Sequence, residues 1–148
     1  IKIEKEKAFN IIVLSKKFNE ETSFEEVPKF WNTYNSSGYQ NVVPPMLGIC
    51  INNDKGIDFE YAIGSLKEYC SEIPEGFKEI NIAEHLWGKF YTKGKMPKAI
   101  QDLWKEVIEW VQNSEYELAD NYDFECYSKG DTDSDDYVSG IWVPLILK

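Results

Sequence analysis

Glu125 is the residue of this sequence best placed for chemistry, because aromatic side chains accompany it on the expected strands. Aromatic residues make up 15% of the chain, and several of them fall outside the expected helical core stripes. Aromatic faces attract cations through their quadrupoles, and a carboxylate removed from water adds a counter-charge. The pattern predicts a ligand-binding site for a small hydrophobic, cationic aromatic compound. The candidate ligand-binding residues are Glu125, Trp87, Tyr61, Tyr127 and Trp142.

Strand alternation sorts these residues by face, because successive side chains of a strand point to opposite sides. On its strand, Glu125 shares a face with Tyr127, and Phe124 points the other way. We expect the Phe124 face to be the core face beneath the helices. We expect Trp87 to lie on an open, concave face that also carries the carboxylate. The alternative is that Glu125 is a surface carboxylate with aromatic residues nearby.

Other catalytic or metal-binding patterns are weak. His85 is the one histidine, so a Ser-His-Asp or Cys-His arrangement would have to use it, and we interpret it as an ordinary turn or pocket-rim residue. The acidic segment 131–136 resembles the start of a calcium loop, but such a loop needs Gly at its sixth position and Glu at its twelfth. Those positions hold Asp136 and Trp142. We therefore expect no catalytic residue, unless the protein is a hydrolase that uses Glu125, and we expect no metal and no cofactor.

The three cysteines do not form a disulfide framework or a zinc ligand set, because their number is odd and no two are close in sequence. Cys50 and Cys126 stand in apolar stretches and are expected to fill the core. A reducing, cytoplasmic location is the simplest interpretation.

The charge of the chain excludes one class of partner. The formal net charge is -10 and there is no Arg, so direct nucleic-acid binding is not expected. No apolar run approaches the ~20 residues that span a membrane. The acidic surface favours cationic ligands weakly through steering, or serves solubility alone.

The periodicity of apolar residues predicts two helices among several strands. In the helix at 97–113, Ile100, Leu103, Trp104, Val107, Ile108 and Val111 form an apolar stripe. The helix at 24–34 carries a similar face. The expected strands are 8–18, 46–52, 57–64, 77–82, 86–92, 122–128 and 137–147, with a turn at 53–56, a short connector at 115–118 and Pro144 marking an edge or a bulge.

This element order predicts an α+β fold. Each half has several strands packed on one helix, so the chain is a duplicated β-α-β-β unit. The expected architecture is an antiparallel sheet with two helices on one face and a ligand groove on the other. No linker separates the halves, so residues 1–148 are expected to form a single domain.

The stretch from Phe77 onward closely resembles the GyrI-like, or AraC-type, effector-binding domain. Val27–Trp31 and Phe59–Gly64 fit the first half of that family. The features of the second half, in order, are the strand at Trp87–Phe90, Lys93–Pro97, the helix with Leu103, Trp104 and Trp110, the segment Asp123–Tyr127, and the closing strand Ile141–Leu145.

The resemblance implies a ligand groove between the halves, and ligands that are often cationic and aromatic. By the same resemblance, Glu125 contacts the cation and Trp87 lines the pocket. Trp87 stands where Tyr is more usual in the family, and residues 83–86 lack the usual lead-in. Ligand identity therefore does not carry over. Many relatives also carry a DNA-binding helix-turn-helix, which this sequence lacks, so the chain is expected to be a stand-alone binding domain or a fragment of a longer regulator.

Two alternative functions stay open at this point. The first is a small-molecule hydrolase, related to stand-alone family members, in which Glu125 acts as general base within an apolar pocket. The second is a protein-binding inhibitor of a DNA enzyme that acts through the acidic surface, so a protein partner belongs among the expectations.

Overall fold

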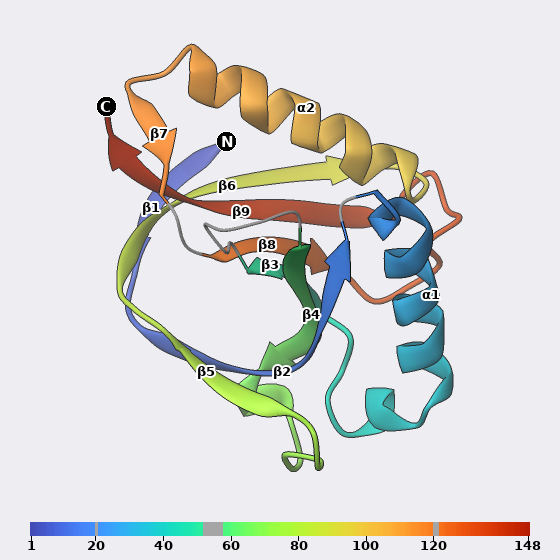
Figure 1. The fold of residues 1–148 in the computed structure, drawn as a ribbon. Coiled ribbons are helices and arrows are strands. Elements are labelled where there is room, and N and C mark those ends of the chain that lie inside the picture. Colours follow the sequence, from blue (N-terminus) through green and yellow to red (C-terminus); the bar gives the residue numbers. More distant parts are fainter. Residues whose placement is uncertain (20, 52–57, 120–121) are drawn as a thin grey trace. The chain divides into compact units, whose positions relative to one another are not determined.

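A computed structural model describes residues 1–19, 21–51, 58–119 and 122–148, and the expected turn at 53–56 lies outside them. The chain divides into two compact units: unit 1 comprises residues 1–7 and 84–148, and unit 2 comprises residues 8–83. The elements, shown in Figure 1, are β1 (Lys2–Glu6), β2 (Phe9–Asn19), α1 (Ser23–Ser36), η1 (Tyr39–Asn41), β3 (Leu47–Ile51), β4 (Asp58–Leu66), η2 (Lys67–Tyr69), β5 (Lys78–Ile82), β6 (His85–Lys93), α2 (Lys98–Gln112), β7 (Tyr116–Leu118), β8 (Tyr122–Tyr127) and β9 (Val138–Leu147).

Unit 2 is an antiparallel sheet with one helix. Its strands are hydrogen-bonded in the order β3-β4-β2-β5. The helix α1 packs onto β2 and β4. Phe30 and Tyr34 from α1 are buried, and they meet Phe18, Tyr61 and Ile63 from the sheet. The apolar face expected on this helix is therefore confirmed, and burial of these large side chains stabilises the unit.

Unit 1 repeats this plan. Its strands follow the order β8-β9-β6-β1, and β7 pairs with the end of β9. The helix α2 runs along β6 and β9 (Figure 1). Its buried residues Ile100, Leu103, Val107 and Val111 follow helical spacing and meet Phe90 and three apolar residues of β9 in one core. Ile108, expected in the same stripe, is 49% exposed.

The duplication inferred from element order is confirmed by the strand pairing. In unit 2, β2 is followed by α1 and then by β3 and β4, which pair with each other. In unit 1, β6 is followed by α2 and later by β8 and β9, which pair with each other. One extra strand also pairs with β2 and one with β6, namely β5 and β1. The α+β fold class, with antiparallel strands and two helices, is therefore correct.

Two segments differ from the sequence-based expectation, and Pro144 has a specific place in the sheet. The charged segment 2–6 forms strand β1, which was not expected, and residues 116–118 form strand β7 rather than a connector. Pro144 lies within β9, opposite Trp87 of β6. On the other side of β9, the partner strand changes at this point from β8 to β7, so a residue without an N–H is tolerated there.

Candidate small-molecule-binding site

Glu125 lies on the face of the unit 1 sheet that α2 covers. In the register of β8 and β9 it stands opposite Ile141, which is fully buried in the core beneath α2. The indole Nε1 of Trp104 donates a hydrogen bond of 2.9 Å to Oε2 of the carboxylate, and the Tyr127 hydroxyl donates one of 2.9 Å to Oε1. Each carboxylate oxygen is thus held by an aromatic side chain.

Trp104 is a site residue that the sequence analysis assigned to the core. The buried neighbours Leu103 and Val107 fix this turn of α2 against the sheet, and Trp104 follows Leu103 at the border of the apolar stripe, half-buried. Its ring packs on the core while its N–H reaches the carboxylate. Because a large aromatic residue in a helical stripe is usually a core residue, the pattern alone could not separate the two roles.

The expected grouping of Glu125 with Trp87 and Trp142 on one face is wrong within unit 1. Trp142 stands opposite Phe124 on one side and Lys89 on the other, and paired residues of neighbouring strands share a face. Phe124 is adjacent in sequence to Glu125 and therefore points to the other side of the sheet. The Phe124 face, expected beneath the helices, faces away from α2, and the Glu125 face is the one that α2 covers.

Trp87 and Trp142 belong to an aromatic cluster on this second face. Trp87 is fully buried, with its ring centroid 5.4 Å from that of Phe124 and 6.2 Å from that of Trp142. Both faces of the unit 1 sheet are therefore packed with large apolar side chains. The open sheet face that the sequence predicted around Trp87 is not present at that residue.

Tyr61, the candidate site residue of unit 2, is buried beside α1. Its hydroxyl oxygen accepts a hydrogen bond of 3.0 Å from the indole Nε1 of Trp31, and the two rings meet edge to face at 6.4 Å. Phe18 also meets the phenol ring edge to face, with centroids 6.4 Å apart. Tyr61 is 4% exposed, so the core of unit 2 fixes the position of this ring.

The two units use their helices in the same way. In each unit a helix presents one half-buried tryptophan whose indole N–H donates to an oxygen on the sheet. In unit 2 the acceptor is the phenol of Tyr61, a neutral group. In unit 1 the acceptor is the carboxylate of Glu125, a charged group. Unit 1 therefore has a negative charge at the position where unit 2 has a neutral hydroxyl.

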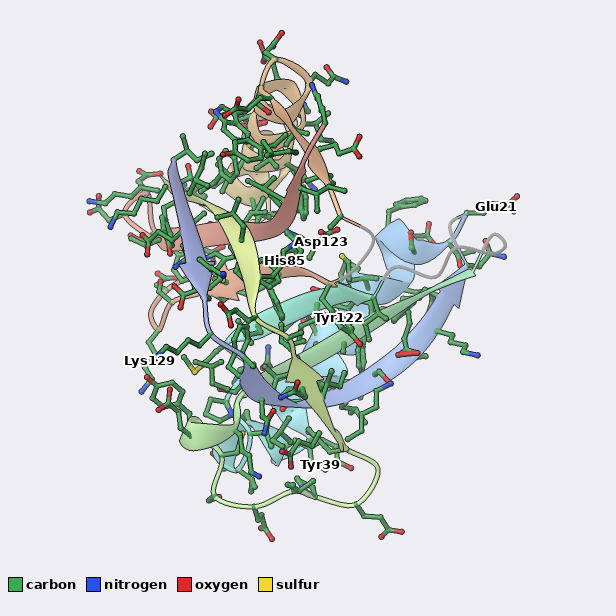
Figure 2. The ribbon with its side chains drawn as sticks, turned by 90° about the vertical axis from the view of Figure 1, so that its left-hand side faces the viewer. Glu21, Tyr39, His85, Tyr122, Asp123 and Lys129 are labelled. Carbon is green, nitrogen blue, oxygen red and sulfur yellow. The ribbon has the colours of Figure 1, made fainter. Side chains whose placement is uncertain are left out.

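His85 packs against an aromatic residue of unit 1. It is the first residue of β6, marked in Figure 2 together with Tyr122 and Asp123 of β8. Its ring packs edge to face on Trp87 with centroids 6.0 Å apart, and its buried Nε2 has no hydrogen-bond partner among the described residues. His85 thus extends the aromatic cluster of the second face.

None of the three cysteines forms a disulfide bond in the described part of the chain, and Cys126 is poorly suited to act as a nucleophile. Burial raises the pKa of its thiol to about 12, with the negative charge of Glu125 adding to this effect and the positive charge of Lys89 opposing it. The thiolate is the reactive form of cysteine, so a raised pKa suppresses reactivity. This agrees with the expectation that Cys126 fills space.

Two further features are absent from the described parts of the chain. No group of three or more His, Cys, Asp or Glu side chains there could hold a metal ion. No helix in the same residues is long and apolar enough to cross a membrane.

Comparison with known proteins identifies the family. The model of the family Cass2, the integron-associated effector binding proteins, matches residues 2–145. This match covers almost the whole sequence, so the chain belongs to that family. The resemblance to a GyrI-like effector-binding domain is thereby confirmed. No sequence among the curated proteins matches the chain.

Solved structures share the fold. SAV2435 bound to tetraphenylphosphonium matches with a TM-score of 0.83 at 22% identity, covering 98% of this chain and 93% of that one. The integron cassette protein VCH_CASS2 of Vibrio cholerae matches with 0.75 at 14% identity, covering 98% and 95%. The C-terminal domain of EcmrR matches with 0.62 at 13% identity, covering 99% and 97%. At these identities the likeness shows the fold alone.

Proposed function

We propose that this protein binds a small hydrophobic cation and that Glu125 supplies the counter-charge. The observation that carries the proposal is the carboxylate itself, half-buried and held by Trp104 and Tyr127 at 2.9 Å each. Removing a carboxylate from water is costly unless it is hydrogen-bonded or meets an opposite charge. Membership of an effector-binding family and the tetraphenylphosphonium bound to SAV2435 support the same ligand class.

The chemistry of the two donors favours a cationic ligand. Both donors are neutral, so they orient the carboxylate without cancelling its charge. Both also present aromatic rings beside it, and such rings attract cations. The ligand contacts that we propose in unit 1 are the Glu125 carboxylate and the rings of Trp104 and Tyr127.

Tyr61 of unit 2 is not included among the contacts of this carboxylate, because its ring is 4% exposed and lies in the core of that unit. Trp87 and Trp142 lie on the second face of the unit 1 sheet and are not included among the contacts of this carboxylate.

Titration with a rhodamine dye tests the proposal. Glu125→Gln keeps the shape of the side chain and removes its charge. We expect this variant to weaken dye binding, followed by quenching of tryptophan fluorescence, at least about tenfold, or ~1.4 kcal/mol. Glu109→Gln, a change on the exposed side of α2, is the matched control and should leave the affinity unchanged. Equal affinities of the wild type and Glu125→Gln would contradict the proposal.

A further inference from the structure

A hollow of about 500 Å³ lies on the second face of the unit 1 sheet, away from Glu125. Its walls are formed by Ile1, Lys2, Glu4, Lys89 and Tyr91. Lys2 stands opposite Lys89 in the register of β1 and β6, and Lys89 stands opposite Trp142 of β9, so their side chains share this face. The site of the proposed function and this hollow are therefore separated by the sheet itself.

The wall of the hollow formed by Lys89 carries a buried positive charge. The Lys89 side chain is 7% exposed, and its ammonium lies 4.0 Å from the centroid of the Trp142 ring. It donates hydrogen bonds to Glu6 and, at 3.5 Å, to Glu4. Burial by itself lowers the pKa of this ammonium, but the hydrogen bonds and charges of the two carboxylates outweigh it and hold the pKa above its ordinary value.

Glu4 is the weakly held member of this cluster. Lys2 and Lys89, two like charges directly opposite on neighbouring strands, repel each other unless an anion lies between them. Glu4 supplies that anion, but its ion pairs are long: a carboxylate oxygen lies 3.7 Å from the Lys2 ammonium and another lies 3.5 Å from the Lys89 ammonium. Its side chain is 44% exposed, so solvent already competes for it. An external carboxylate can take the same position between the two ammonium groups.

Tyr91 supplies an aromatic wall with a polar end. The hydroxyl oxygen accepts a hydrogen bond of 3.0 Å from the indole Nε1 of Trp142, which leaves the hydroxyl hydrogen available as a donor. A Cβ built at Gly140 would lie 2.7 Å from the Tyr91 ring, so the absence of a side chain there lets the ring lie close to β9. The ring is fixed at its edge by Trp142, yet Tyr91 is 56% exposed.

We propose that this hollow is a second small-molecule site, selective for aromatic carboxylates. The carboxylate of the ligand binds between Lys2 and Lys89 in place of Glu4 and accepts a hydrogen bond from the Tyr91 hydroxyl. The aromatic part of the ligand packs on the Tyr91 ring beside Ile1. The site is independent of the proposed cation site and has the opposite charge preference.

Calorimetric titration with 2-naphthoate tests this site, with neutral 2-naphthamide as the matched ligand. We expect the naphthoate to bind more tightly, and we expect it to shift the indole Nε1–H signal of Trp142 in the ¹H–¹⁵N spectrum. The expected Kd is in the millimolar to high micromolar range, because small ligands lose translational and rotational freedom for few contacts.

Substitutions of exposed residues give the sharpest test because their expected effects have opposite signs. Glu4→Gln removes the competing carboxylate and should tighten naphthoate binding about threefold, whereas Lys2→Gln should weaken it about threefold. Lys89→Met removes the buried ammonium and should weaken binding at least about tenfold. Lys105→Gln, on the exposed side of α2, is the control and should change nothing.

Several outcomes would overturn the proposal. These are equal affinity for naphthoate and naphthamide, no detectable naphthoate binding, or the same response in the Glu4→Gln and Lys2→Gln variants. Glu125→Gln should leave naphthoate binding unchanged while weakening the dye. If the wild type did not bind the dye, the proposed function would be contradicted, but the aromatic carboxylate site would not. The two failures are therefore distinguishable.

Discussion

The indole nitrogen of Trp104 lies 2.9 Å from a carboxylate oxygen of Glu125, so a hydrogen bond joins helix α2 to strand β8 within unit 1. This contact fixes the negative charge that the proposed function requires. Hydrogen bonds to charged groups contribute more to stability than neutral ones, and a buried acceptor that loses its donor is costly.

The first prediction concerns the contribution of this contact to stability. Trp104→Phe keeps an aromatic ring and removes the N–H donor. We expect the free energy of unfolding in urea to fall by about 2 kcal/mol. In a Glu125→Gln background the same change should cost less, because the acceptor is then neutral. Equal costs in both backgrounds would show that the loss comes from packing of the ring.

The second prediction compares the two units. Trp31→Phe removes the equivalent donor from α1, whose acceptor is the neutral phenol oxygen of Tyr61. We expect a loss of about 1 kcal/mol in the free energy of unfolding, smaller than that of Trp104→Phe. A larger loss for Trp31→Phe would mean that the charge of the acceptor does not decide the strength of these bonds.

The third prediction is a dependence of stability on alkaline pH. Burial holds the pKa of Cys126 at about 12, above the value of a thiol in the unfolded chain. Below the unfolded value both states keep the proton. As pH rises past it, the unfolded chain loses its proton first, so the free energy of unfolding falls with rising pH.

Cys126→Ala should remove this component, about 1–2 kcal/mol between pH 7 and pH 10. Urea unfolding of the wild type and the variant at both pH values measures it. Parallel pH profiles would contradict the raised pKa, as would fast alkylation of the native Cys126 thiol by iodoacetamide at pH 8.

Much of the fold follows from apolar periodicity. The stripe at Ile100, Leu103 and Val107 predicts α2 because these residues recur at helical spacing, and all three are buried. Such patterns depend on local sequence, so they do not need knowledge of which segments pair.

The position of Glu125 could be predicted only in part. Alternation correctly predicts that Phe124 points away from it, but alternation does not say which face meets a helix. Phe124 was expected to mark the face beneath the helices, because apolar residues usually face a core. In unit 1 both faces of the sheet are packed, and on the face away from α2 Phe124 is 2% exposed and Trp87 is fully buried. Only the long-range pairing with β9 distinguishes the two faces.

Strand β1 could not be predicted for a similar reason. Four of its five residues are charged, which is typical of exposed chain. Two of them, Glu4 and Glu6, are bound by Lys89, which lies more than eighty residues further along the chain. The partner that makes the segment a strand is therefore not visible in its local pattern.

The most direct test of the central claim compares two ligands of nearly equal size and shape and opposite charge. Tetraphenylphosphonium and tetraphenylborate are titrated by calorimetry into the wild type and Glu125→Gln. We predict that the wild type prefers the phosphonium at least about tenfold and that Glu125→Gln loses most of this preference. An undiminished preference in Glu125→Gln, or a wild type that binds both ions equally, would contradict the assignment of Glu125 as the counter-charge.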